Sequence, residues 1–557
     1  MSLQSDHALW LKSYPEGIAP ELDFAEGETF LSAVEESLTA NAANTAVRCL
    51  GTDMTYAELD EASRAFAAAL QSLKLSPGAR VALMMPSLPQ YLVCLLGVLR
   101  GGFVATGVNP LYTPREMRHQ LADSGAEALV ILEQFAAGFE SIRSETQVKH
   151  VILTSVGDVF GGVKRHIANF KLRKLDKAVP AFKLPGALRY REMLARGAKA
   201  PWSHPTPKPE DVAVLQYTGG TTGIAKGAML SQRNLLAAMR MSGAWLAPAL
   251  EQAPRVAAPV GVMPLPLYHV YTLYTTAMLL SQGGCSVQVP NPRDLGALIK
   301  AMKAQPFHLM TGLNTLYAGL LAHPDMASVD VSHTRVFIAG GTSTHHHTAE
   351  AWHALTGNWI TEGWGMSETS GAGTCNPWPT PGFTHSIGVP MPSVLVEIRD
   401  EDGTPLPHDQ PGELWVKGPH VMSGYWRMDE DPFDANGFLA TGDVAMMDDA
   451  GFIHIVDRKK DMILVSGFNV YPNEIEEVLS DLEGVLEAAA VGVPDAKTGE
   501  SVKVFVVKKD PALTEEDVRA HCSKALTNYK RPRSVVFLDE LPKTPVGKIM
   551  RRMLRER

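Results

Sequence analysis

Cysteine is scarce in this 557-residue sequence, and no two cysteines have the spacing of a metal-binding motif. The five cysteines are Cys49, Cys94, Cys285, Cys375 and Cys522, an odd number without any CxxC pair. Zinc sites and redox dithiols use such close pairs, and scattered thiols are typical of the reducing cytosol. We therefore expect a cytoplasmic protein without a zinc site.

An excess of positive charge is also missing. The formal net charge is -9, which offers no general attraction to nucleic acid and makes that class of partner the least favoured. The first residues, MSLQSDHALWLKSYPEG, lack a basic start followed by an apolar run. We expect no signal peptide.

One long segment lacks charge altogether. Between Ala257 and Pro292 there is no Asp, Glu, Lys or Arg. A membrane-spanning helix needs about 20 predominantly apolar residues, and this segment is interrupted by Pro264, Pro266 and the pair Gly283–Gly284. The sequence predicts a buried core segment beside a ligand pocket rather than a span.

Helical and strand patterns alternate along most of the chain. Thr55 and Glu58 have the spacing of a capping box and open a helix that reaches Leu73. The apolar run RVALMMP follows as a strand, and Pro114 begins another helix. Such alternation is typical of α/β sheets with helices on their faces, and 557 residues suffice for two to four domains.

The composition of the sequence and its pattern of predicted elements change past Gly437. A charged, turn-rich stretch leads into a pattern of helix, strand, strand, helix and strand, about a hundred residues long, which suits a small α/β domain. We place the boundary near residues 457–460. The prediction is a large domain over 1–456, a hinge at 457–460 and a small mobile domain over 461–557.

A glycine- and threonine-rich loop follows one of the predicted strands. Residues 216–230 read QYTGGTTGIAKGAML. Small residues expose backbone N–H groups and hydroxyls, and Lys226 adds a compact positive charge, so the loop predicts phosphate binding. It is not a Walker A motif, because Ala225 precedes Lys226 and Gly227 follows it.

Four further motifs accompany this loop. They are EGWGMSET at 362–369, TGD at 441–443, DRKKDMI at 457–463 and PKTPVGKI at 542–549. All five occur in the order of the acyl-adenylate-forming (AMP-binding) superfamily, and nearly the whole chain resembles that family. The resemblance is closest to bacterial long-chain fatty-acid–CoA ligases.

The resemblance implies an ATP-dependent reaction in two steps. A fatty-acid carboxylate attacks the α-phosphate of ATP, giving acyl-AMP and pyrophosphate, and the thiol of coenzyme A then displaces AMP. Both reactants of the first step are anionic, so the site must neutralise charge and hold them in line. ATP, coenzyme A, a fatty acid and Mg²⁺ are the implied ligands.

The resemblance also implies a role for each matched position. Lys548 should bridge the α-phosphate and the carboxylate, Ser367 should touch the α-phosphate, and Glu368 should hold Mg²⁺. The phosphate loop should contribute Tyr217, Thr218, Gly219, Gly220, Thr221, Thr222, Gly223 and Lys226. The adenosine should lie against Gly340, Gly341, Thr342, Glu362, Gly363, Trp364, Gly365, Asp443 and Arg458. The acyl group should lie beside Tyr268, His269 and Gly341.

The small domain of the resembling family rotates between the two steps. Lys460 matches the hinge, and Ser466 and Gly467 match the loop presented for the second step. Two departures concern the acyl pocket and the adenine. Ser370 and Gly371 replace the usual small residue and proline, and Trp364 stands where the family usually has tyrosine, keeping the aromatic face without the hydroxyl.

Several alternatives remain open at this point. A ligase for medium-chain or aryl acids, or one that loads a carrier-protein thiol, would carry the same motifs. An oxygenase of the luciferase type would as well. A non-catalytic lipid- or nucleotide-binding protein is a different class, and the presence of Glu368, Asp443, Arg458 and Lys548 argues against it.

Two surface features complete the predictions. The triplet His345–His347 is interpreted as the start of a helix, because adjacent helical residues point about 100° apart and do not converge on one metal ion. Residues 163–188 carry seven basic residues and one acid, with apolar residues between them. Such a segment indicates either a solvated helix or peripheral contact with the inner face of the cell membrane. A homodimer is also left open.

Overall fold

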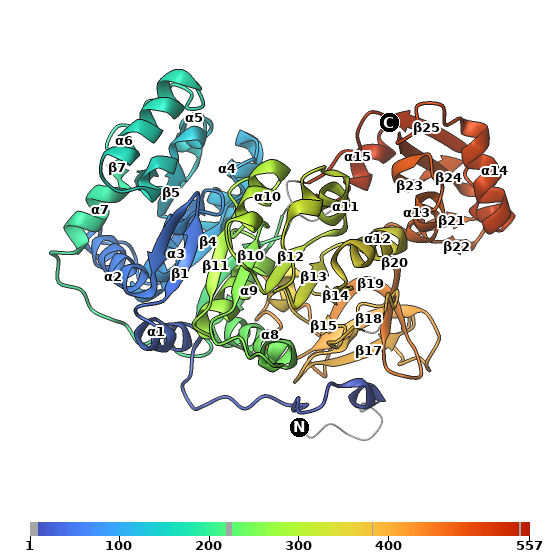
Figure 1. The fold of residues 1–557 in the computed structure, drawn as a ribbon, viewed down its shortest axis with the longest axis horizontal. Coiled ribbons are helices and arrows are strands. Elements are labelled where there is room, and N and C mark those ends of the chain that lie inside the picture. The colour runs from blue at the N-terminus through green and yellow to red at the C-terminus, as the bar shows by residue number, and fades with distance from the viewer. Residues whose placement is uncertain (1–8, 219–224, 381, 430, 545–546) are drawn as a thin grey trace.

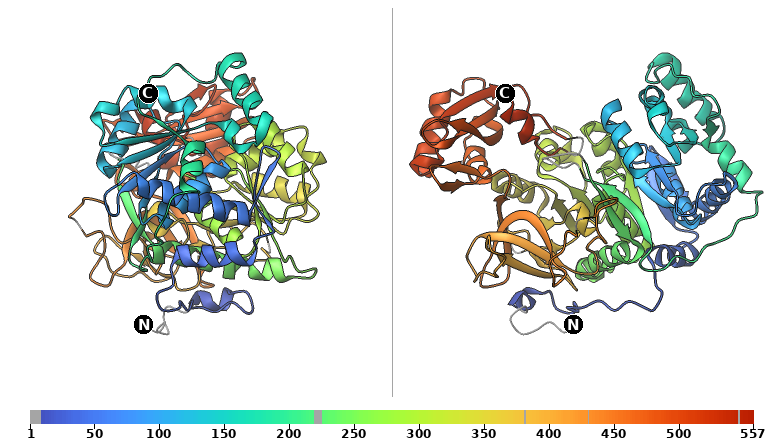
Figure 2. Two further views of the ribbon diagram at one scale, coloured as in Figure 1. Left: turned by 90° about the vertical axis from the view of Figure 1, so that its left-hand side faces the viewer. Right: turned by 180° about the vertical axis from the view of Figure 1, so that it is seen from behind.

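A computed structural model describes residues 9–218, 225–380, 382–429, 431–544 and 547–557. It confirms the α/β fold class, with a large N-terminal domain and a smaller C-terminal one. The C-terminal part, drawn red in Figure 1, stands at one side of the large domain. The right-hand view of Figure 2, seen from behind, shows the same separation.

One sheet of the large domain has the strand order β7-β6-β5-β3-β4-β8-β9, and every pairing in it is parallel except that of β8 with β9. Its strands are β3 (Arg80–Met84), β4 (Val104–Gly107), β5 (Ala128–Leu132), β6 (His150–Thr154), β7 (Leu188–Arg189), β8 (Val212–Tyr217) and β9 (Gly227–Ser231). The associated helices are α2 (Tyr56–Ser72), α3 (Pro89–Arg100), α4 (Pro114–Ser124), α5 (Ala136–Glu140), α6 (Gly162–Phe170) and α7 (Tyr190–Gly197). The predicted capping box forms at Thr55, and a second one at Thr113 opens α4.

The second sheet has the order β16-β15-β14-β13-β12-β10-β11-β1-β2 and is parallel from β14 to β1. Its strands are β1 (Thr45–Cys49), β2 (Thr52–Thr55), β10 (Val260–Met263), β11 (Cys285–Gln288), β12 (Leu309–Gly312), β13 (Val336–Gly340), β14 (Ile360–Trp364), β15 (Thr374–Cys375) and β16 (Val389–Pro390). Its helices are α1 (Phe30–Ala40), α8 (Gln232–Glu251), α9 (Val270–Ser281), α10 (Leu295–Lys303), α11 (Asn314–Ala322) and α12 (His346–Thr356).

The uncharged segment between Ala257 and Pro292 forms β10, α9 and β11 in the middle of this sheet. Ten of the twelve residues of α9 are buried, which confirms the prediction of a core segment. Within the described ranges, no helix combines the length and the hydropathy that crossing a bilayer requires.

A smaller antiparallel sheet leads to the C-terminal domain. It consists of β17 (Leu395–Arg399), β18 (Gly412–Lys417), β19 (Leu439–Met447) and β20 (Ile453–Arg458). The C-terminal domain then contains β21 (Ile463–Val465), β22 (Phe468–Val470), α13 (Pro472–Ser480), β23 (Val485–Asp495), β24 (Gly499–Lys508), α14 (Glu515–Ala525), β25 (Ser534–Leu538) and α15 (Arg551–Arg555). The order of helix, strand, strand, helix and strand predicted from the sequence is present from α13 to β25.

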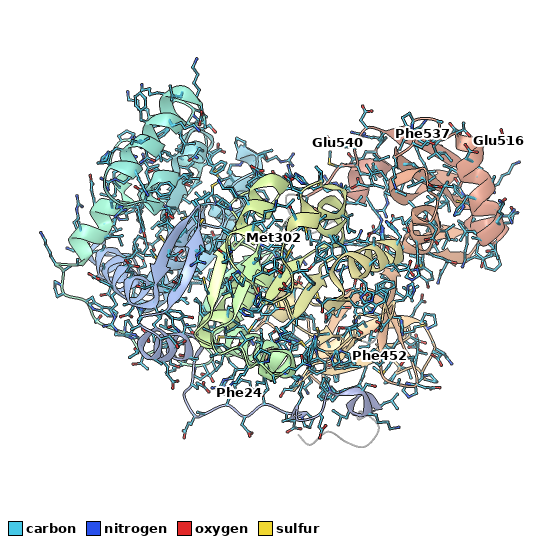
Figure 3. All side chains as sticks on the ribbon, viewed as in Figure 1. Phe24, Met302, Phe452, Glu516, Phe537 and Glu540 are labelled. Atoms are coloured by element: carbon cyan, nitrogen blue, oxygen red, sulfur yellow. The ribbon has the colours of Figure 1, made fainter. Side chains whose placement is uncertain are left out.

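An aromatic cluster fixes helix α12 on the second sheet. His345 occupies the N-cap position of this helix, so the histidine triplet lies at a helix start, as the sequence predicted. On its inner face, the Trp352 ring lies 4.7 Å from the ring of Tyr317 and 5.0 Å from that of Phe337, both edge to face. Met302 of α10 belongs to the same buried cluster and is labelled in Figure 3. Aromatic pairs of this geometry add stabilisation beyond the area they bury.

Replacing the anchor of α12 should therefore destabilise the large domain. We expect Trp352→Ala to lower its free energy of unfolding by about 3–5 kcal/mol, because a fully buried indole leaves a cavity. The matched control is Leu355→Ala on the exposed face of the same helix, which should change that energy by no more than about 0.5 kcal/mol. Urea unfolding followed by circular dichroism measures both, and equal effects would contradict the role given to the cluster.

Candidate active site

Two neighbouring parallel strands end at one edge of the second sheet and bring the predicted glycines together. Strands β13 and β14 pair so that Gly340 lies opposite Gly363. Gly341 follows with φ +81°, a left-handed conformation that favours glycine. A Cβ on Gly365 would lie 2.3 Å from the carbonyl oxygen of Gly371. A side chain is excluded at Gly365 because two backbone segments approach each other closely there.

Lys548 reaches this edge from the C-terminal domain. A turn positions it: the Thr544 N–H donates to the Lys548 carbonyl at 2.7 Å, and the Lys548 N–H donates to the Thr544 hydroxyl at 3.1 Å. Its Cε lies 3.3 Å, and its Nζ 3.7 Å, from where a Cβ on Gly341 would stand. Burial, followed by the nearby Arg458 cation, lowers the pKa of Lys548 to about 8.

Asp443 and Arg458 face each other on neighbouring antiparallel strands, β19 and β20. Arg458 Nε lies 2.5 Å from Asp443 Oδ1. The indole N–H of Trp364 donates to Asp443 Oδ2 at 2.9 Å. Burial raises the pKa of Asp443 against the opposing effects of Arg458 and Trp364. The tryptophan that replaces the family's tyrosine thus supplies a donor to this carboxylate as well as an aromatic face.

Glu368 lies in a short turn with Ser367, and both line the same cavity. The Tyr425 hydroxyl donates to Glu368 Oε1 at 2.8 Å. The Lys226 ammonium lies 5.1 Å from the centroid of the Tyr425 ring. Tyr425 is a residue that the sequence analysis missed, and no periodicity or motif that we considered marks it.

Tyr425 is held by backbone pairing across the chain. The Met229 N–H donates to the Gly424 carbonyl at 2.9 Å, and the Trp426 N–H donates to the Gly227 carbonyl at 2.8 Å. Residues 423–426 therefore lie against β9, which follows the phosphate loop. Only the folded chain brings Tyr425 close to both Lys226 and Glu368.

The stem of the phosphate loop is closed by hydrogen bonds. The Thr218 N–H donates to the Lys226 carbonyl at 3.0 Å. The Tyr217 hydroxyl donates to Asp123 Oδ2 at 2.5 Å, which ties the stem to α4. The predicted residues Gly219, Gly220, Thr221, Thr222 and Gly223 lie outside the described residues.

A buried acid lines the floor of the cavity. Glu362 Oε1 accepts a hydrogen bond from the Thr344 N–H at 3.1 Å, and burial raises the pKa of Glu362 to about 7. Among the described atoms, the hydroxyls of Thr342 and Tyr271 are buried without a hydrogen-bond partner. Both residues line the cavity. Buried hydroxyls need partners, so this wall is suited to a polar ligand.

These groups surround one cavity of about 2090 Å³ with an aromatic and apolar arm. The arm is the part of the lining that α8, α9 and the residues just before α9 contribute, and it includes Trp245, Tyr268, Tyr271, Tyr274 and Met278. His269, the residue directly before α9, also lines the cavity. Burial, and then Lys548, lowers the pKa of His269 to about 4, so this imidazole is neutral at physiological pH.

Not every predicted residue is at the cavity. Ser466 and Gly467 form an exposed turn between β21 and β22, with φ 54° and 82°, and neither lines it. Lys460 does line it, just after β20, and burial lowers its pKa. No group of three or more His, Cys, Asp and Glu residues suited to a metal ion occurs in the described parts of the chain.

Known protein families and known proteins match this chain over most of its length. The AMP-binding enzyme family matches residues 34–426, and the AMP-binding enzyme C-terminal domain matches residues 474–548. A long-chain-fatty-acid–CoA ligase from Yersinia pestis is 46% identical over 552 residues, which is 98% of each chain. A protein of the same name from Escherichia coli O6:H1 has the same identity and coverage.

Among solved structures, ATP-bound MatB from Rhodopseudomonas palustris superposes with a TM-score of 0.80. Its sequence is 29% identical, and the match covers 94% of this chain and 98% of that one. The family match and the full-length relatives confirm the resemblance to the AMP-binding family that the motifs indicate. This chain belongs to the AMP-binding enzyme family.

Proposed function

We propose that this chain is an ATP-dependent fatty-acid–CoA ligase that acts on long-chain fatty acids. The observation that carries the proposal is the convergence of Lys548, Glu368 and the Asp443–Arg458 pair on one cavity that continues into an apolar arm. These residues come from separate sheets and from both domains. The full-length relatives at 46% identity bear the name of this activity.

In the first step, a carboxylate oxygen forms a bond to the α-phosphorus of ATP while the bond to the pyrophosphate oxygen breaks. We assign Lys548 to bridge the two anionic reactants and to neutralise the charge that concentrates between them. Ser367 lies on the same wall and is assigned to the α-phosphate. The loop from Thr218 to Lys226 is assigned to the β- and γ-phosphates, which leave as pyrophosphate.

The adenosine half of the ligand is assigned to the polar end of the cavity. Asp443 accepts the ribose hydroxyls, supported by Arg458, and Trp364 presents its ring to the adenine. Gly340, Gly341 and Thr342 border the base and the acyl carbonyl. Glu362 orders the segment after β13 through its bond to the Thr344 N–H.

Mg²⁺ is part of the proposal because the donor set fits it. Glu368 supplies a buried carboxylate, and Mg²⁺ prefers oxygen ligands completed by substrate phosphates. The ion would neutralise phosphate charge when bound. Tyr425 holds Glu368 Oε1 in place toward the cavity.

The second step requires that the C-terminal domain move. We propose domains over 1–456 and 461–557 with a hinge at 457–460, centred on Lys460. Asp457 supports this division, since its Oδ1 accepts from the Arg458 N–H at 2.7 Å and its Oδ2 from the Asn473 N–H of α13 at 2.9 Å. Rotation would withdraw Lys548 and present the turn at Ser466 and Gly467 to coenzyme A, whose thiol then displaces AMP.

The acyl chain is assigned to the arm beside Tyr268 and His269. A neutral imidazole places no charge beside this apolar lining, which avoids the cost of burying an ion there. A cytoplasmic location, contact with the inner face of the cell membrane through residues 163–188 and a homodimer stay predictions.

Product analysis tests the activity. With ATP, Mg²⁺ and coenzyme A, we expect AMP and pyrophosphate to form with long-chain acids, and little of either with acetate or benzoate. AMP formed with short or aromatic acids would contradict the substrate, and ADP would contradict the mechanism. No turnover with any acid would favour a carrier-protein thiol or a binding role.

The role of Lys548 predicts a difference between the half-reactions. Lys548→Ala should slow acyl-AMP formation about 10²- to 10³-fold, the usual effect of losing one preorganised electrostatic contact. Transfer of a supplied acyl-AMP to coenzyme A should stay close to the wild-type rate. Lys524→Ala, an exposed lysine of the same domain, is the control. Equal losses in both half-reactions would refute the assignment.

The pKa of Lys548 predicts an alkaline limb in the first half-reaction. The ammonium is present below its pKa of about 8 and is lost above it, so kcat/KM for acyl-AMP formation should fall about tenfold per pH unit above that value. Pyrophosphate release without coenzyme A measures it and avoids titration of the thiol. Lys548→Arg should remove the limb, because guanidinium stays charged. A limb that persists in this variant must come from another group.

A further inference from the structure

Helix α6 and the π-helical turn that continues it, η6 (Lys171–Leu175), expose an apolar stripe. Val163, Ile167, Phe170 and Leu175 are between 59% and 73% exposed. Eleven large apolar side chains are exposed among the described residues, and these four fall within thirteen consecutive positions. Helix α6 lies at the outer end of the large domain (Figure 1). The clustering separates this stripe from the isolated exposed residues that surfaces usually carry.

The stripe is continuous along the helix. At 100° per residue, positions 163, 167 and 170 fall within about 60° of one another. Lys164 and Lys171 project beside them on one side, and Lys174 follows in the π-helical turn. The exposed face therefore combines a narrow apolar strip with a lysine border.

The face that packs on the protein is polar instead. Asn169 is buried, and its Oδ1 accepts from the Gly157 N–H at 2.9 Å. Arg173 Nη2 lies 2.6 Å from Oε2 of the buried Glu133. A surface helix normally directs its apolar face to the core, so this helix is attached by polar contacts while its apolar face points away from the domain.

Positive charge surrounds the stripe and is not neutralised by the chain. Lys164, Lys171, Lys174 and Lys177 are exposed, and none of them forms an ion pair within the described parts of the chain. Asp176 is the sole acid between residues 163 and 188. The whole chain carries a net charge of -9, so the positive charge is local to this surface.

We propose that α6 and η6 form a docking surface for an anionic phospholipid bilayer, with the helix lying in the interface. Val163, Ile167, Phe170 and Leu175 would enter the boundary between headgroups and acyl chains, and the lysines would extend to the phosphates. Fourteen residues are too short to span a bilayer but suit a helix parallel to its surface. A nucleic acid would use the charge but not the apolar strip.

Vesicle binding tests the proposal without using the ligase reaction. The full-length protein is sedimented with phosphatidylcholine vesicles that contain or lack phosphatidylglycerol. We expect binding that depends on phosphatidylglycerol and weakens with salt. The triple variant Lys164→Gln, Lys171→Gln, Lys174→Gln should bind about 100-fold more weakly, at about fivefold per lysine. The double variant Ile167→Ala, Phe170→Ala should lose about tenfold or more.

The matched control is Lys300→Gln, Lys303→Gln, Lys524→Gln, which removes the same charge from exposed positions elsewhere and should bind as wild type. Unchanged binding by both α6 variants would overturn the proposal. So would loss in the lysine variant alone together with competition by RNA, which would indicate a polyanion site. A third outcome would also overturn it: the wild-type protein binds no vesicles, sediments as a dimer, and becomes a monomer in the Ile167→Ala, Phe170→Ala variant. That result would assign the stripe to contact with a second copy of the chain.

Discussion

A buried lysine cation at the junction of two domains is the constraint on which the candidate site depends. Lys548 belongs to the C-terminal domain, yet its side chain stands against Gly341 of the large domain. Burial alone would favour the neutral amine, and Arg458 acts in the same direction, while Asp443 and Glu368 act against it. An anionic ligand beside Lys548 would favour the charged form of this side chain further. The arrangement is therefore matched to a substrate that brings negative charge of its own.

The same constraint explains the residues around it. The glycines at the ends of β13 and β14 leave room for a lysine that arrives from another domain, and the cost of its desolvation is shared with two carboxylates. Each carboxylate is itself held: Asp443 by Arg458 and Trp364, Glu368 by Tyr425. Because the contacts of Asp443 with Trp364 and of Glu368 with Tyr425 lie within the large domain, a rotation of the small domain would break the lysine contact and leave these two in place. This separation suits a site that performs two steps in sequence.

The polar attachment of α6 has a different physical origin. Most helices of the large domain bury apolar faces, as α9 and α12 do, and their packing contributes to the stability of the domain. Helix α6 contributes little of this kind, because its large apolar side chains face outward and its contacts to the core pass through Asn169 and Arg173. Such a helix is retained without the usual hydrophobic gain, which is the physical reason to look for a partner on its outer face.

The amino-acid sequence determined the alternation of elements, the helix starts and the identity of the chemical groups. Capping boxes at Thr55 and Thr113 act through residues three positions apart, so local sequence suffices for them. Uncharged β10, α9 and β11 were recognisable as core because burial of charge is costly. The motifs likewise named Lys548, Asp443 and Glu368 through resemblance alone. Their roles stay proposals.

Tertiary structure alone decided which groups meet. Tyr425 reaches Glu368 because residues 423–426 pair with a strand almost two hundred positions earlier, and no local pattern encodes that pairing. The hydrogen bond that the Trp364 indole donates to Asp443 likewise depends on the folded chain. So does the outward orientation of the α6 stripe. Helical periodicity shows that apolar residues share a face, but which side of the helix meets the protein depends on the surface it packs against, and that surface forms only when the chain is folded.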